Sequence, residues 1–413
     1  MGGLARLRTA IRLRFMAASI PAETSAAAPR TAEPVAAVVL VTRAVIVAAA
    51  LIVIGLIWDI AWHRSVGRDT FWSPPHLVEY AAAVIVGLSC GWLILRTTFA
   101  GSETERAAMV RFWGFRGPLG AWVSVWGALA MLTSAPFDDW WHNAYGLDVE
   151  IVSPPHMVLL AGMLAIVMGA MLMALARQNR TAAVGQSGAR LGYAFASGLV
   201  LLLLVTATFE YTGFPNLWRG KAFYQISAAI FPFALAFAAR TGKLGWPATA
   251  TALCFMLASL VLSWSLQLVP ATPRLAPIQN PITHLVPAPF PLLLAIPALG
   301  FDLVYRRFGE RGDWKLSLLL GITFVLLMIA ASWPAAAFLM SPSARNPVFL
   351  ADQWDYSARL GPWRYQYWDS VQEIRSGSQV RPIGIGLLVA VLFASASARL
   401  GLAWGRWMRE VKR

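Results

Sequence analysis

Four of the five histidines in this chain lie in two short stretches of similar sequence, residues 59–76 and 138–156. In each stretch an aspartate comes four residues before a histidine that follows a tryptophan, and Ser-Pro-Pro-His closes the stretch, with one residue inserted in the second. The acidic and imidazole side chains concerned are Asp59, His63, His76, Asp138, His142 and His156. Because chance does not readily produce such a pair, we expect the function to lie in these residues.

Aspartate and histidine at this spacing are side chains that bind metal ions together. Asp59 and His63 are one helical turn apart, so both project from the same face of a helix. Ser73 and Pro74 are typical of the start of a second helix, which puts His76 in its first turn. The positive end of a helix favours the neutral imidazole that a metal ion requires. Each stretch therefore predicts a site with one carboxylate and two imidazoles.

The residue types leave the identity of the metal open. Imidazole and carboxylate together suit copper, zinc, iron or nickel. Cys90 and Cys254 both lie inside apolar segments, so the chain offers neither a disulfide framework nor a CxxC metal site. The donors must therefore be nitrogen and oxygen atoms.

The connections between the ligands differ between the two stretches. Each contains a glycine and an aspartate two residues later, at Gly67–Asp69 and Gly146–Asp148, and we interpret these as turn residues. The second stretch has apolar residues where the first has Arg68 and Thr70, and so it lacks polar side chains that can orient the ligands. We therefore predict two separate sites, of which the first binds metal more tightly.

The composition is that of a membrane protein. Of 413 residues, 58% are hydrophobic and 13% are charged, whereas roughly a quarter of the residues in a soluble domain are charged. A net charge of +14 indicates nucleic-acid binding only where the basic residues form one face. Here they lie between apolar segments, which indicates orientation of the chain in a bilayer and no nucleic-acid partner.

Ten apolar segments have lengths near the ~20 residues that a membrane-spanning helix requires. They are residues 36–60, 77–99, 118–138, 156–176, 191–212, 223–240, 245–267, 287–305, 315–339 and 382–404. We therefore predict an all-α fold, a polytopic integral membrane bundle of about 10 transmembrane helices.

Most lysines and arginines outside these segments fall on the side of the termini, which predicts cytoplasmic termini in the inner or plasma membrane. All five histidines then lie at the periplasmic or extracellular face. The predicted organisation is a cytoplasmic basic tail at 1–34, a duplicated helix-pair unit at 35–180, helices five to nine with an outer loop at 181–340, an outer aromatic interfacial segment at 341–381, and a last helix with a basic cytoplasmic tail at 382–413.

The residues from Asp59 to Tyr80 resemble the metal-site signature of the C subunit of the copper membrane monooxygenases, the particulate methane and ammonia monooxygenases. That signature has an aspartate, a histidine four residues later and a second histidine thirteen residues after that, with Arg-Asp-Thr between the histidines, and all are present here. The resemblance implies that Asp59, His63 and His76 hold copper.

In that family an asparagine and a histidine, four residues apart on a later helix, contribute to a neighbouring copper position. Asn280 and His284 have this spacing, so the resemblance extends the ligand set to them. The matching residues cover only 59–80, the family subunit is shorter and has fewer helices, and the second Asp-His-His stretch is not a feature of the family. The resemblance therefore implies a divergent relative with a duplicated metal motif.

Two functions fit these residues. The first is a copper-dependent membrane monooxygenase or oxidase, or a subunit of one, that activates dioxygen at the outer face and oxidises a small apolar substrate entering from the lipid. The second is a non-catalytic protein that acquires, stores or transfers copper or another metal such as zinc or iron. Transfer predicts ionisable side chains along the bilayer, for which Glu210 and Asp302 are candidates. The expected partners are the lipid bilayer, further subunits or a second copy of the chain, and the substrate.

Overall fold

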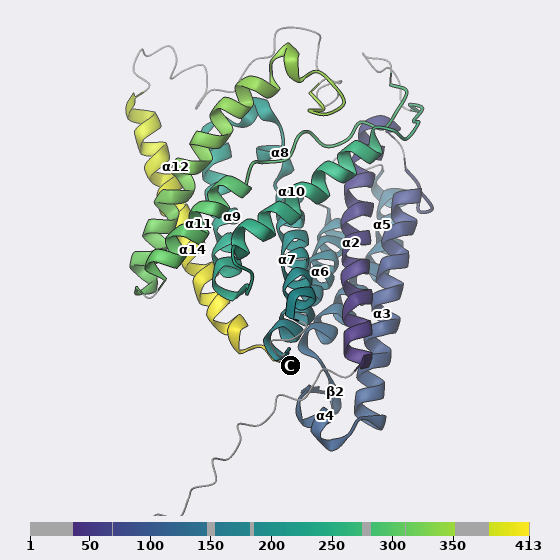
Figure 1. Ribbon diagram of the computed structural model, residues 1–413. Helices are drawn as coiled ribbons and strands as arrows, with labels where there is room; N and C mark the ends of the chain where they lie inside the picture. Colours follow the sequence, from purple (N-terminus) through teal and green to yellow (C-terminus); the bar gives the residue numbers. More distant parts are fainter. Residues whose placement is uncertain are drawn as a thin grey trace, which may run out of the picture. The chain divides into compact units, whose positions relative to one another are not determined.

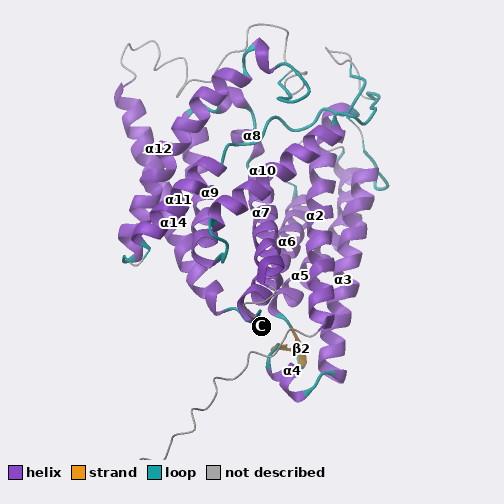
Figure 2. Cartoon of the chain, in the orientation of Figure 1, coloured by secondary structure: helices purple, strands orange, loops and turns teal. Residues whose placement is uncertain are grey.

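The structure is a computed structural model that describes residues 36–67, 69–146, 153–181, 186–274, 282–309, 311–351 and 380–412. Helix is the predominant structure of this described chain, and Figure 2 shows its one small strand region at one end. The predicted tail at 1–34 and most of the predicted aromatic segment at 341–381 lie outside the described residues.

Nine helices in the described part of the chain are long and apolar enough to cross a membrane, which confirms the predicted all-α membrane bundle. They are α2 (Ala36–Ser65), α3 (Pro74–Ala100), α5 (Leu119–Tyr145), α6 (Pro154–Arg180), α7 (Gln186–Ala207), α9 (Lys221–Thr241), α10 (Pro247–Leu266), α12 (Asp313–Leu339) and α14 (Val380–Glu410). The shorter elements are α4 (Glu103–Ala107), β1 (Val110–Phe112), β2 (Phe115–Gly117), α8 (Phe209–Thr212), α11 (Ala295–Phe308) and two 3₁₀ turns, Pro215–Leu217 and Pro342–Ala344.

The two similar stretches of sequence build two helix pairs that pack against each other (Figure 1). One stretch joins α2 to α3 and the other joins α5 to α6, while α3 packs on α5 and α2 packs on α6. Between the pairs, α4 and the hairpin of β1 and β2 form the connection from α3 to α5. α3 runs back to the end of the bundle where α2 began, and α5 starts from that end. The α2–α3 and α5–α6 connections therefore lie together at the other end of the bundle.

Glycines hold α5 and α6 in close backbone contact. Gly120 and Gly127 on α5 lie against Gly169 and Gly162 on α6. A Cβ atom at Gly162 would lie 2.9 Å from the Gly127 carbonyl oxygen and 2.9 Å from the Met131 backbone nitrogen, which is closer than side chains come. Helices in lipid associate mainly through van der Waals packing of this kind. The second helix pair therefore depends on these small residues.

The tenth predicted span, residues 287–305, is only partly helical. α11 begins at Ala295, and residues 282–294 before it form no helix. Pro287, Pro289 and Pro291 explain the difference, because proline lacks an N–H donor and disfavours the helical conformation in the residue before it. Hydropathy alone does not reveal this constraint.

The partly extended segment still runs along the full length of α10. At one end of α10, Ser263 Oγ donates a hydrogen bond to the Ala288 carbonyl oxygen at 3.1 Å. At the other end, the Arg306 guanidinium lies 3.5 Å from the centre of the Trp246 ring. Residues 288–306 therefore lie antiparallel to α10, as a non-helical stretch followed by α11.

The last helix, α14, packs on α9 and α12. Its end is tied to α6, because the Asn179 side-chain amide donates to the carbonyl oxygens of Met408 at 3.3 Å and Val411 at 2.8 Å. Figure 1 shows this terminus at the end of the bundle that carries α4 and β2. That end lies opposite the two ligand-bearing connections.

We expect Gly162→Leu to destabilise the protein and Gly91→Leu to leave it stable. Added atoms at Gly162 meet the backbone of α5, so the helices must separate, and overpacking of this kind costs about 1–3 kcal/mol or more. A Cβ atom at Gly91 meets nothing within 4 Å, and leucine has the higher helix propensity. Thermal unfolding in detergent, followed by tryptophan fluorescence, compares the two variants. Equal midpoints would contradict the close packing of α5 on α6.

Candidate metal centre

The first group of ligands forms a ring in which carboxylates and imidazoles alternate. Asp59 and His63 lie in the last turns of α2, Asp69 in the connection and His76 in the first turn of α3. His63 Nε2 is 3.6 Å from Asp59 Oδ2 and 3.5 Å from Asp69 Oδ2. His76 Nε2 is 3.3 Å from Asp59 Oδ1 and 3.3 Å from Asp69 Oδ2. Four side chains therefore converge on one small region.

Asp69 is part of this ring, so its interpretation as a turn residue was wrong. Gly67 does have the positive φ of 81° that a turn glycine adopts, but the Asp69 carboxylate faces both histidines. The hydrogen bond with His63 lowers the pKa of Asp69 to about 2, so the carboxylate is ionised at neutral pH. The sequence feature that could have identified Asp69 is the aspartate at matching positions of both stretches. A glycine followed by an aspartate is also typical of an ordinary turn, so this feature was ambiguous.

The connection before α3 fixes the orientation of His76. Its Nδ1 lies 2.9 Å from the Thr70 carbonyl oxygen, and because a carbonyl only accepts, Nδ1 carries a proton and Nε2 is the nitrogen that faces the two carboxylates. Thr70 N in turn donates to Ser73 Oγ at 2.7 Å. Ser73 precedes α3 as predicted, but its hydroxyl bonds to the connection and makes no capping hydrogen bond to the helix. The hydroxyl thus supports the ligand instead of the helix end.

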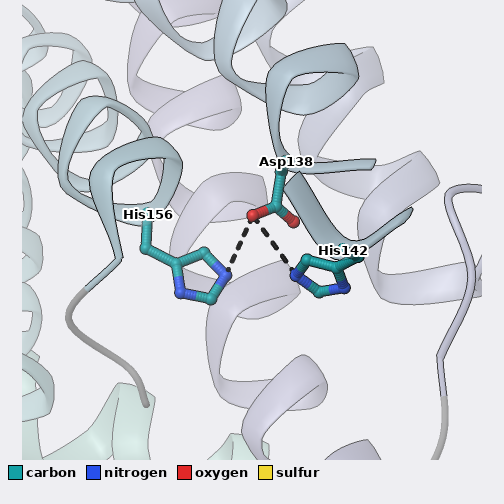
Figure 3. A group of neighbouring side chains, drawn as sticks. All are labelled: Asp138, His142 and His156. Carbon is teal, nitrogen blue, oxygen red and sulfur yellow. Dashed lines mark ion pairs between the residues drawn. The ribbon is translucent and has the colours of Figure 1, made fainter. Parts of the chain in front are cut away.

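Asp138 brings together the second group (Figure 3). Its Oδ1 is 3.5 Å from His142 Nε2 and 3.4 Å from His156 Nε2, and the two imidazole centroids are 6.3 Å apart. Ser153, the counterpart of Ser73, caps α6, because its Oγ accepts a hydrogen bond from His156 N at 3.4 Å. Asp148, the counterpart of Asp69, lies outside the described residues.

The separations between donor atoms fit a bound metal ion. With metal–ligand bonds of about 2.0–2.1 Å, the corners of a tetrahedron are roughly 3.3–3.4 Å apart, and the acid–imidazole distances in both groups are 3.3–3.6 Å. Asp59 Oδ1 is buried and accepts no hydrogen bond from the residues that the structure describes. A cation satisfies such an oxygen, which is otherwise costly to bury. Both groups therefore have the donor chemistry and spacing of a metal site.

Tyr80 lies near both groups. Its ring is 5.2 Å from that of Phe71 and 6.2 Å from that of His76, between centroids. Its hydroxyl is within electrostatic range of Asp59 in the first group and of Asp138 in the second. The two groups are therefore neighbours, as the packing of α3 on α5 requires.

A distant segment holds the last turn of α2 in place. Ser65 Oγ accepts a hydrogen bond from Val286 N at 2.7 Å, and Arg64 donates to the Pro287 carbonyl oxygen at 2.9 Å. The Val66 carbonyl oxygen accepts a hydrogen bond from Arg274 N at 3.0 Å. Nothing in the sequence pattern indicated that the end of α2 beside the first group is braced by Arg274, Val286 and Pro287.

His284 belongs to neither metal-capable group of the described residues. It is exposed, its Nδ1 lies 2.9 Å from Thr283 Oγ1, and its backbone pairs with Pro270. Asn280, its expected partner, lies outside the described residues. The extension of the ligand set to these two residues stays a prediction.

Comparison of the chain with models of protein families, with curated proteins and with solved structures gave no match. The class of protein therefore follows from the fold and the site. It is a multi-pass helical membrane protein whose described residues include two neighbouring carboxylate–histidine groups at one end of the bundle.

Two adjacent aspartates on α5 provide a matched test of the second group. Asp138 faces both imidazoles, whereas Asp139 is exposed and accepts only from the Asn143 side chain. We expect Asp138→Asn to lower the affinity of this group for copper or zinc at least about tenfold, because it removes the anionic ligand, and Asp139→Asn to leave it unchanged. Titration of both variants with the metal measures the two affinities. An equal loss of affinity in the two variants would show that the loss comes from the change in net charge and not from removal of a ligand.

Proposed function

We propose that the protein is a copper-binding membrane protein that oxidises a small apolar substrate with dioxygen, alone or as one component of a larger enzyme. The observation that carries the proposal is the ring of Asp59, His63, Asp69 and His76, together with the second group around Asp138. The basic residues favour a cytoplasmic position for the opposite end of the bundle, so the ring faces the outside of the inner or plasma membrane.

Copper suits the donors that the two groups offer. Imidazole nitrogen and carboxylate oxygen together bind copper well, although zinc and iron also accept them. When bound, copper supplies one-electron redox chemistry and reaction with dioxygen. The chain positions the ligands: Thr70 holds His76 in the tautomer whose Nε2 faces the ring, and Asp69 adds a second negative charge.

Glu79 extends the first group toward the interior of the bundle. It lies one helical turn beyond His76 on α3, it is only 3% exposed, and Asp59 and His76 are its charged neighbours. Gly55 on α2 makes room for it, because a Cβ atom there would lie 2.5 Å from Glu79 Cγ. Ionisable groups buried in membrane segments are costly and are generally functional. We therefore propose that the Glu79 carboxyl group accepts and releases protons as the charge of the first group changes.

An apolar cavity of about 50 Å³ lies beside α2. Ile57 and Ile60 line it from α2, within one turn of Asp59, and Phe290 and Pro291 line it from the non-helical segment before α11. Non-helical backbone at membrane depth occurs where protein buries it or where it lines a cavity. The size and the apolar lining support a small apolar substrate.

Metal transfer across the bilayer has less support than oxidation. Asp302, a candidate step on such a path, instead caps α10, because its carboxylate accepts hydrogen bonds from Ala248 N at 3.1 Å and Thr249 N at 2.8 Å. Glu210, the other candidate, is exposed on α8. Acquisition or storage of copper at the outer face is the second candidate function, favoured by the 41% exposure of the His63 side chain.

Copper analysis of purified, reconstituted protein tests the proposal. The double variant His63→Ala with His76→Ala should lose about half of the copper, and His142→Ala with His156→Ala the other half, because each removes two ligands from one group. Electron paramagnetic resonance should show coupling to histidine nitrogen that changes in each variant. Complete loss from either pair would mean one composite site, and full zinc occupancy without copper would count against oxidation.

The second stretch has Leu147 and Val149 in place of the polar residues Arg68 and Thr70, which predicts that the first group binds copper more tightly than the second. In a background of His142→Ala with His156→Ala, we expect Asp69→Asn to weaken copper binding about 10–100-fold, as loss of a group that supports a metal typically does. Glu103→Gln, which changes an exposed carboxylate near the opposite end, should have no effect. Competition with a chelator gives the affinities, and an unchanged value for Asp69→Asn would remove Asp69 from the ligand set.

A further inference from the structure

Basic side chains surround a second cavity, at the end of the bundle opposite the metal groups. Val39 at the start of α2 and Met173 near the end of α6 give this cavity an apolar wall. Arg177, Arg180 and Lys412 line the rest of it. Arg180 donates to the Ala108 carbonyl oxygen at 3.0 Å, and Asn179 ties the chain that leads to Lys412 onto α6. The cavity is thus built from segments far apart in the sequence.

The charged side chains that line this cavity are all positive. Arg43 on α2 is the charged neighbour that acts on Arg177, and the side chains of Arg177 and Lys412 make no hydrogen bond or ion pair with the described residues. Burial, with Arg190 and Lys412 nearby, lowers the pKa of the Lys243 ammonium. Like charges held this close repel one another unless an anion joins them.

In another basic cluster at this end, an acidic side chain neutralises part of the positive charge. The Asp313 carboxylate lies between the guanidinium groups of Arg240, Arg399 and Arg406. Arg96 and Arg106 likewise pair with glutamates of α4. Arg177 and Lys412, in contrast, form no ion pair with the acids of the described residues.

We propose that this cavity binds an anionic phospholipid, whose phosphate pairs with Arg177, Arg180 and Lys412. Guanidinium groups match phosphate oxygens in pairs, and basic pockets between membrane helices bind anionic headgroups. The apolar wall favours a lipid over a free anion. Leu40 and Val47 on α2 are 65% and 58% exposed, and they provide an apolar surface for the acyl chains on the same helix as Arg43.

Native mass spectrometry of the purified full-length protein tests this site by titration with phosphatidylglycerol and phosphatidylcholine of identical acyl chains. We expect phosphatidylglycerol to bind at least about tenfold more tightly, because only its headgroup leaves the phosphate charge unbalanced. Equal affinities for the two lipids would overturn the proposal. Inorganic phosphate is the third probe, and displacement of phosphatidylglycerol by millimolar phosphate would indicate a free-anion site instead.

A pair of charge-matched variants localises the binding. Arg177→Gln with Arg180→Gln and Lys412→Gln should weaken phosphatidylglycerol binding at least about tenfold and leave phosphatidylcholine binding unchanged. The control removes three exposed charges elsewhere at this end, with the substitutions Arg111→Gln, Arg307→Gln and Arg311→Gln. It should keep wild-type affinity, and an equal loss in both variants would overturn the proposal.

Lys412→Gln alone separates the loss of charge from misfolding. Lys412 is exposed and follows the end of α14, so its substitution removes no packed side chain. We expect this single change to weaken phosphatidylglycerol binding about fivefold while thermal stability stays that of the wild type. Wild-type affinity in this variant would exclude Lys412 from the site and contradict the proposed cluster.

Discussion

A bilayer offers no water to polar groups, so each must find its partner inside the protein. The nine long helices meet this requirement for their own backbones. The exception is the non-helical segment before α11, where other side chains take up the carbonyl groups: Arg64 bonds to Pro287 and Ser263 to Ala288. Asp302, from the same pass of the chain, satisfies the first N–H groups of α10. The irregular pass is therefore stabilised by its neighbours on both sides.

The same requirement explains why the ligand groups were visible in the sequence. An aspartate and two histidines at the ends of apolar helices are costly residues, and a helical turn of four residues places Asp59 beside His63 without any tertiary information. A Ser-Pro-Pro start then places His76. Periodicity and helix-start rules were therefore sufficient for three of the four members of the ring, and equally for Asp138, His142 and His156.

The remaining features depend on contacts that no local pattern encodes. Asp69 lies in the connection between α2 and α3, where no helical repeat predicts the direction of a side chain. Only the path of the backbone shows that its carboxylate faces the histidines. Hydropathy predicted a tenth span at 287–305, but three prolines keep the part before α11 out of a helix. The close approach of α5 and α6 required knowledge of which glycines face each other, and a single sequence shows only that glycines recur at similar spacing.

The brace on the last turn of α2 can form only late in synthesis. Ser65 and its partner Val286 are 221 residues apart in the chain. At about 5–20 residues per second, synthesis of that interval takes roughly ten to forty seconds. All described ligands of the second group have been made well before then. The nascent chain therefore passes through a stage in which the residues of α5 and α6 have been made while the last turn of α2 still lacks its bond to Val286.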